Sequence, residues 1–133
     1  MKLFLDTNIF LDLILKRENY QESVIILNAI EKNIFSGVVL DITILNIDYI
    51  AKKQVKDIKE FLALINSLFE VVGASNKEIK EALSISNSDL EDSLQYVCAK
   101  HSKCKLIISN DKNFVKTDIK TLSSKEFVEQ YLD

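Results

Sequence analysis

Apolar residues along this chain fall into two patterns, short uninterrupted runs and longer stretches with apolar positions three and four residues apart. The short runs cover residues 2–5, 37–42, 70–73, 105–109 and 118–121, and each is typical of a buried strand. The longer stretches predict helices over residues 6–17, 20–33, 43–53, 55–69 and 76–83, another from residue 88 through 98, and a last one that begins near residue 123. Short strands therefore alternate with long helices along the whole chain.

This alternation favours parallel strands, because a parallel neighbour is reached only through a long right-handed crossover. The predicted fold class is α/β, a three-layer α/β/α domain with a central parallel five-stranded sheet. The 133 residues include no proline and only two glycines, whereas Greek-key barrels and sandwiches need many turn residues. No linker or repeat interrupts the pattern, so we expect residues 1–133 to form a single domain.

The composition narrows the class of protein further. Hydrophobic residues make up 47% and charged residues 28%, which is typical of a soluble globular chain. A formal net charge of −3 argues against a generally basic nucleic-acid binder. Cys98 and Cys104, in a chain without a signal peptide, indicate reduced thiols and a cytoplasmic location. No apolar stretch is long enough for a transmembrane helix, so no membrane partner is expected.

Four acidic residues lie at positions where a soluble fold does not require charge. Asp6 directly follows the first strand, Asp111 lies two residues beyond the fourth, and Asp89 and Asp92 begin a helix. In parallel sheets, ligands bind beyond the carboxyl ends of the strands, where the strand order reverses. If the first and fourth strands are neighbours, the acids converge. Ligands that are all oxygen suit Mg²⁺ or Mn²⁺, and zinc is disfavoured.

Each of these acids also has a purely structural explanation. Asp6 can cap the helix that follows it, and Asp111 can belong to a turn. Asp89 and Asp92 suit the positive end of a helix dipole. Only their joint placement at one sheet edge favours a metal site.

Two further acids are interpreted as structural. Ser88-x-x-Glu91 matches a capping box at the start of its helix. Asp12 lies six residues beyond Asp6 on the first helix and is expected to be solvated.

Lysines surround the acids in the sequence. The segment from Lys100 to Lys120 holds six lysines and two acids, a net charge of +4. A second run, Lys52 to Lys59, is interpreted as a solvated helix face. An acidic metal centre with a basic rim suits phosphodiester chemistry on a polyanion.

Four segments, in their order along the chain, resemble motifs of the PIN-domain ribonucleases, particularly the VapC-like bacterial type. They are MKLFLDTNIFLDLIL, ITILNIDYIAKK, SDLEDSLQYVCA and LIISNDKNF. The resemblance implies that Asp6, Asp92 and Asp111 are the catalytic metal ligands, and that Asp89 is an additional acid for a second ion or its waters. It also implies that Asn8 and Ser109 orient ligands or a phosphate, although capping and turn hydrogen bonds would explain both residues as well.

Two positions depart from the family pattern. Asn46 stands where many members have a Glu, and Asn113 stands where a second Asp often precedes Phe114. Asn46 is expected to offer its amide oxygen without a charge, so one ion would bind tightly and a second one weakly.

The implied function is a metal-dependent endoribonuclease that uses one or two Mg²⁺ or Mn²⁺ ions. The resemblance further implies the toxin of a toxin–antitoxin pair, with an RNA substrate, an antitoxin protein as partner and a homodimer as the active form. One alternative is a non-catalytic PIN-like RNA- or protein-binding module, which the two asparagines favour. Another is a phosphoacceptor receiver domain, which the order of the motifs disfavours.

Overall fold

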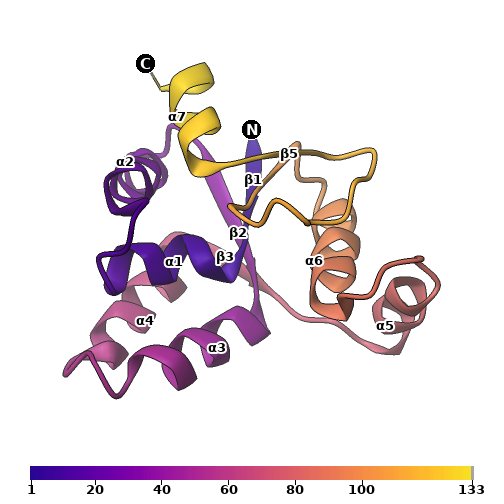
Figure 1. Ribbon diagram of the computed structural model, residues 1–133, viewed down its shortest axis with the longest axis horizontal. Coiled ribbons are helices and arrows are strands. Elements are labelled where there is room, and N and C mark those ends of the chain that lie inside the picture. Colours follow the sequence, from indigo (N-terminus) through magenta and orange to yellow (C-terminus); the bar gives the residue numbers. More distant parts are fainter. Residues whose placement is uncertain (133) are drawn as a thin grey trace.

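Five parallel strands form the centre of the structure, in the spatial order β3-β2-β1-β4-β5. The computed structural model describes residues 1–132, and Figure 1 shows helices on either side of this sheet. The predicted three-layer α/β/α class is confirmed. The strands are β1 (Lys2–Leu5), β2 (Ser36–Leu40), β3 (Phe69–Val72), β4 (Leu106–Ile108) and β5 (Lys120–Leu122).

The helices divide between the two faces of the sheet. They are α1 (Thr7–Ile14), α2 (Tyr20–Glu31), α3 (Asp41–Ala51), α4 (Ile58–Leu68), α5 (Asn76–Leu83), α6 (Leu90–His101) and α7 (Ser124–Tyr131). Helices α1 to α4 and α7 cover one face, and α6 covers the other, with α5 packed on its outer side (Figure 1). Within residues 1–132, no helix is both long and apolar enough to cross a membrane.

The side chains of β1 alternate between two apolar clusters, as a strand buried on both faces requires. Leu3 and Leu5 pack in the cluster that contains the residues of α1 to α4. Phe4 packs on the opposite face with Cys98 and Ala99 of α6. Cys98 is buried among these apolar side chains, so it is a packing residue, and burial raises the pKa of its thiol to about 11.

Predicted and observed elements correspond one to one, with their ends shifted by a few residues. The predicted fifth strand begins too early, because Asp118 lies outside the sheet and accepts a hydrogen bond from the Tyr96 hydroxyl at 2.6 Å. The capping box predicted at Ser88 and Glu91 is wrong. Helix α6 begins at Leu90, because the Asp89 side chain accepts the capping hydrogen bond from the Asp92 amide.

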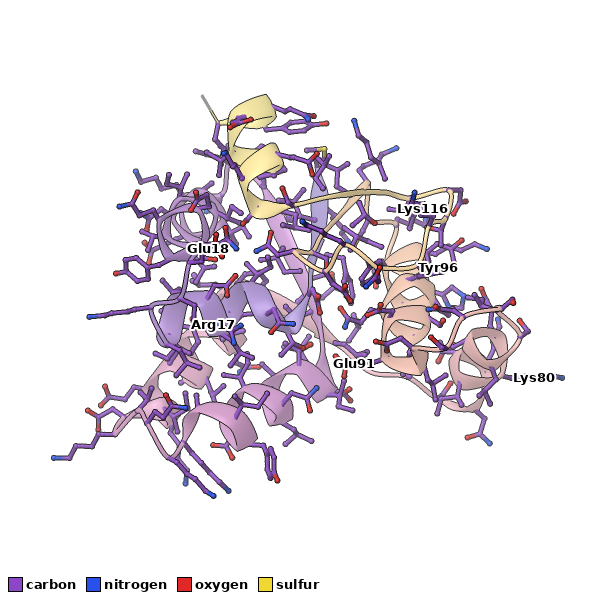
Figure 2. The ribbon with its side chains drawn as sticks, in the orientation of Figure 1. Arg17, Glu18, Lys80, Glu91, Tyr96 and Lys116 are labelled. Carbon is purple, nitrogen blue, oxygen red and sulfur yellow. The ribbon has the colours of Figure 1, made fainter. Side chains whose placement is uncertain are left out.

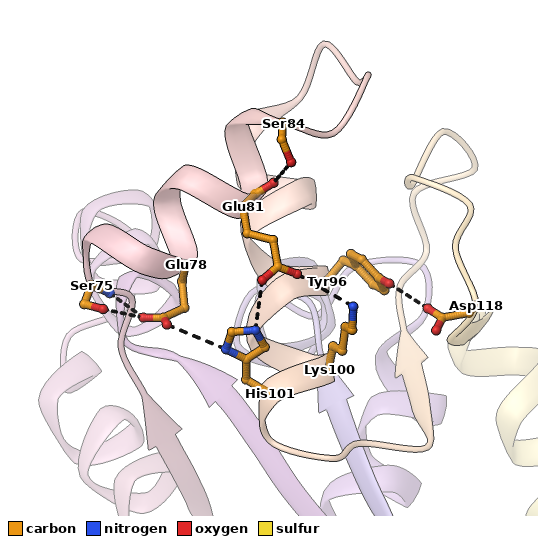
Figure 3. Close-up of polar contacts among 8 residues, drawn as sticks. All are labelled: Ser75, Glu78, Glu81, Ser84, Tyr96, Lys100, His101 and Asp118. Carbon is orange, nitrogen blue, oxygen red and sulfur yellow. Dashed lines mark hydrogen bonds and ion pairs between the residues drawn. The ribbon is translucent and has the colours of Figure 1, made fainter.

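Helix α5 is held against α6 by a small set of polar contacts on the surface, shown in Figure 3. His101 Nε2 lies 3.0 Å from Glu81 Oε1, and its Nδ1 lies 3.6 Å from Glu78 Oε2. Lys100 Nζ lies 3.8 Å from the other oxygen of Glu81. Water screens exposed contacts of this kind and they add little to the free energy of unfolding, so they orient α5 more than they stabilise it.

The strand order reverses between β1 and β4. From β1 the chain proceeds through β2 and β3 to one edge of the sheet, and β4 and β5 then extend the other side. Leu5 pairs with Ile108, and the Asp6 amide donates to the Ile108 carbonyl at 3.0 Å. The strands that precede Asp6 and Asp111 are therefore neighbours, which was the condition for the acids to converge.

Gly37 of β2 is required by the close approach of Phe69 on β3. A Cβ atom at residue 37 would lie 2.4 Å from Phe69 Cε2 and 3.0 Å from Ile30 Cδ1. Phe69 is buried and makes an edge-to-face contact with Phe10, so its ring has little room to move. We expect Gly37→Ala to lower the free energy of unfolding by about 2 kcal/mol in urea titrations.

Gly73→Ala is the matched control for this prediction. A Cβ atom there would meet Asp41 Oδ2 at 2.8 Å, at the end of an exposed side chain that can rotate away. We expect its free energy of unfolding to stay close to that of the unchanged protein. Equal losses in the two variants would contradict the steric explanation.

Candidate functional site

Asp6 is buried at the carboxyl end of β1, and both of its side-chain oxygens are hydrogen-bonded. Oδ2 accepts from Ser109 Oγ at 2.8 Å, and Oδ1 accepts from Gln95 Nε2 at 3.1 Å. Asp6 occupies the N-cap position of α1, but its side chain makes no capping hydrogen bond. Capping therefore does not explain this acid, whose carboxylate is held by the end of β4 and by α6.

Ser109 connects Asp6 to the segment that follows β4. Its hydroxyl donates to Asp6 and accepts a hydrogen bond from the Asp111 amide at 3.1 Å. The Asp111 carboxylate in turn accepts from the Asn113 amide at 2.9 Å, which forms a tight turn. These bonds place the Asp111 side chain beside the end of β1.

The start of α6 brings two more carboxylates to the same place. Asp89 is exposed at the N-cap, and Asp92 is buried three residues later. Asp89, Asp92 and Asp111 each offer an oxygen atom within 4.8 Å of the other two. Asp6 lies next to these three acids, because Ser109 joins it to Asp111 and its charge acts on Asp92. The four acids singled out in the sequence thus gather at the edge where the strand order reverses. We call them the acidic cluster.

The charges of the acidic cluster repel one another. Burial, and then the nearby Asp89 and Asp6, raise the pKa of Asp92 to about 7. Burial also raises the pKa of Asp6, although its hydrogen bonds from Ser109 and Gln95 oppose the shift. Within residues 1–132, no Lys or Arg side chain forms an ion pair with any of the four acids. The described side chains therefore supply no positive charge to neutralise these acids, and a bound cation would supply it.

The acidic cluster fits a hard divalent cation. Asp92 Oδ2 is buried and has no hydrogen-bond partner within the described part of the chain. A buried carboxylate oxygen without a partner costs several kcal/mol, and coordination of a cation removes that cost. Because all the ligands on offer are oxygen atoms, the site suits Mg²⁺ or Mn²⁺ better than zinc.

Glu91 belongs to this region, although its sequence context indicated a helix cap. Its two oxygens accept from Asn46 Nδ2 at 3.3 Å and from Gln95 Nε2 at 3.2 Å. Burial and the neighbouring Asp6 and Asp89 raise its pKa. Figure 2 shows Glu91 at the start of α6.

Asn46 and Gln95 therefore have roles that the sequence pattern missed. Asn46 was expected to present its amide oxygen, and that stays a prediction; the structure adds that its amide NH₂ group donates from α3 to Glu91. Gln95 donates from one nitrogen to both Asp6 and Glu91. The available signal was the spacing of four residues from Glu91 to Gln95, which places both on one face of a helix.

Asp12 is buried, so the prediction that it is solvated is wrong. Its oxygens accept from Arg17 Nε at 3.0 Å and from Asn110 Nδ2 at 3.1 Å. Arg17 Nη2 also donates to Asn8 Oδ1 at 3.0 Å, so the exposed Asn8 is held by an arginine in the connection between α1 and α2. The Asn110 hydrogen bond therefore joins Asp12 of α1 to the segment after β4.

Comparisons with known proteins identify the family of this chain. The PIN domain model matches residues 2–113. The chain belongs to the PIN-domain family. The Ribonuclease VapC1 of Aquifex aeolicus (strain VF5) is 33% identical to it over 141 residues, covering 98% of this chain and 95% of the relative.

Solved structures share the fold of this PIN domain. A chain of a toxin–antitoxin complex from Klebsiella pneumoniae has a TM-score of 0.70 at 20% identity. The match covers 92% of this chain and 97% of the Klebsiella chain. VapBC2 from Rickettsia felis, bound to a DNA fragment from the promoter, has a TM-score of 0.63 at 17% identity. The match covers 92% of this chain and 98% of the VapBC2 chain.

Removing the Asp92 charge should stabilise the metal-free PIN domain at alkaline pH. The pKa of Asp92 rises from 3.8 to about 7 on folding, so stability is lost as the pH rises through this interval. At pH 8, without divalent ions, we expect Asp92→Asn to raise the free energy of unfolding by about 1 kcal/mol, a value reduced for solvent screening. The difference should vanish near pH 4. Denaturant titrations at both pH values measure it.

Asp118→Asn is the matched control, because the Tyr96 hydroxyl lowers the pKa of this exposed acid. Its substitution is expected to leave stability at pH 8 unchanged or slightly reduced. A stabilisation equal to that of Asp92→Asn would indicate a general effect of net charge and contradict the local explanation.

Proposed function

We propose that this PIN domain is a metal-dependent endoribonuclease that hydrolyses RNA phosphodiester bonds. The observation that carries the proposal is the acidic cluster at the sheet's reversal point, with a buried Asp92 oxygen that lacks a partner. In this proposal Asp6, Asp92 and Asp111 are the catalytic ligands of one or two Mg²⁺ or Mn²⁺ ions, and Asp89 assists. The ribonuclease named among its relatives supports the same activity.

In this proposal, the side chains of the site hold the metal ion and orient its ligands. A divalent ion at the cluster would lower the pKa of a water molecule and neutralise charge on a phosphate oxygen. Ser109 and Gln95 fix the Asp6 carboxylate from two sides, so it needs little reorganisation when substrate arrives. Hydrolysis by water requires no covalent nucleophile from the chain.

Glu91 weakens the case for a non-catalytic module. That alternative relies on the neutral Asn46 in place of an acid, yet Asn46 donates to the carboxylate of Glu91. Glu91 thus brings a negative charge to the space between α3 and α6. We propose that it supports a second ion through water molecules, next to Asp6.

We further propose that the protein is the toxin of a toxin–antitoxin pair, acts in the cytoplasm, and has an antitoxin as its protein partner. The structures with the same fold, which come from toxin–antitoxin complexes, support this assignment. A homodimer as the active form stays a prediction.

Cleavage of a mixed RNA pool tests the activity. We expect cleavage with Mn²⁺ or Mg²⁺ and none with EDTA, and we expect Asp6→Asn to lower the rate by about a hundredfold or more because a buried ligand loses its charge. Product bands on denaturing gels measure the rate. Asp57→Asn, an exposed acid whose side chain makes no capping bond, is the control and should keep full activity.

Persistent cleavage in EDTA, or equal rates for Asp6→Asn and the unchanged protein, would refute the metal mechanism. Absence of cleavage under every condition would favour the binding module.

The role of Glu91 has a separate test. We expect Glu91→Gln to raise the Mn²⁺ concentration for half-maximal cleavage by about tenfold, because residues that support metal ligands contribute factors of this size. Metal titrations of the cleavage rate measure the shift. Glu31→Gln, at an exposed position on α2, should behave like the unchanged protein. An unshifted titration for Glu91→Gln would restrict Glu91 to a structural role.

A further inference from the structure

A groove of about 880 Å³ begins at the acidic cluster. Ser109, Asn110 and Asp111 line one end of it. The loop between β4 and β5, the start of α7 and the connection between α1 and α2 line the rest. Figure 2 shows Glu18 on that connection and Lys116 on that loop. The groove therefore extends from the cluster across the β5 side of the sheet.

Positive charge dominates this groove beyond the cluster. The lysines that line it are Lys112, Lys116, Lys120 and Lys125. Within residues 1–132, none of them forms an ion pair with an acid. Apart from Asp111, which belongs to the acidic cluster, the acids that line the groove are Glu18 and Glu126, and Glu126 accepts a hydrogen bond from the Ser123 amide at 2.9 Å. Four lysines against two glutamates leave two positive charges in excess.

The fold selects these lysines from a longer basic stretch. Of the lysines between residues 100 and 120, only Lys112, Lys116 and Lys120 line the groove. Lys100 lies on the α5 side of α6 and pairs with Glu81 (Figure 3). The positive charge next to the acidic cluster is thus concentrated on one path that leads away from it.

The lining also offers apolar surface. Phe114 is buried beneath the groove, and Val115 and Ile119 are partly exposed along it. Grooves that combine cations for the backbone with apolar or aromatic side chains for unpaired bases are typical of single-strand binding. A double-stranded RNA presents backbone and a shallow groove instead of base faces, so it would leave this apolar lining unused.

We propose that this lysine groove binds the backbone of single-stranded RNA on one side of the phosphate that is cleaved. The inference rests on the proposed function, because it supplies the path by which the substrate reaches the acidic cluster. The lysines would attract and align the strand, while the cluster would carry out the cleavage.

Binding of a fluorescently labelled, mixed-sequence single-stranded RNA oligonucleotide in EDTA tests the groove without cleavage. The test variant is K112Q/K116Q/K120Q, with all three lysines exposed. We expect at least about tenfold weaker binding, and a salt dependence whose slope falls by about 2, because each lost phosphate contact to a single strand removes about 0.7. Fluorescence anisotropy over a range of salt concentrations measures both quantities.

The matched control is K52Q/K56Q/K59Q, which removes the same charge from a second hollow near the start of α4. This variant should bind the oligonucleotide as the unchanged protein does. Equal weakening in both variants would show attraction by overall charge and overturn the proposal. Unchanged binding in the groove variant, or no binding by the unchanged protein at low salt, would also overturn it.

These outcomes separate the groove from the activity. Suppose that cleavage depends on metal and is abolished by Asp6→Asn, while the groove variant binds RNA with unchanged affinity. This result would refute the RNA-binding role of the groove and support the nuclease activity. The opposite result is RNA binding that depends on the groove lysines, without cleavage in any metal. It would support the RNA-binding role of the groove and refute the nuclease activity.

Discussion

Mutual repulsion among buried carboxylates is the constraint on which the site depends. Asp6 and Asp92 lie within the fold beside two further acids, and no basic side chain of the described chain pairs with them. Hydrogen bonds donated by Ser109 and Gln95 stabilise the ionised carboxylate of Asp6. Burial first, and then the charges of the neighbouring acids, raise the pKa of Asp92 to about 7, a shift of the kind that clusters at functional sites.

The same constraint explains how the surrounding residues are arranged. Gln95 uses one nitrogen to join Asp6 and Glu91, and Asn46 reaches Glu91 from α3. Helices from both faces of the sheet are thus tied to one edge by polar contacts. Such a network holds the carboxylates in a fixed arrangement but lowers the free energy of unfolding, a compromise that is common at functional sites.

The net charge of the chain says little about its partners until the positions of the charged residues in the fold are known. The value of −3 argues against a partner such as RNA, but four of the acids form the cluster. The groove beside it carries four lysines, so positive charge faces the proposed substrate path. The average charge of a chain conceals an arrangement in which acids and lysines occupy adjacent surfaces.

The sequence by itself determined the fold class and the main acids, because apolar spacing and the placement of Asp6 and Asp111 after strands depend on local order along the chain. Tertiary structure alone decided which polar residues meet. Asp12 is buried and accepts a hydrogen bond from Asn110 of the segment after β4. Glu91 accepts one from Asn46, a residue 45 positions away in the sequence. Contacts between distant elements leave no periodic signal, so only the packed fold reveals them.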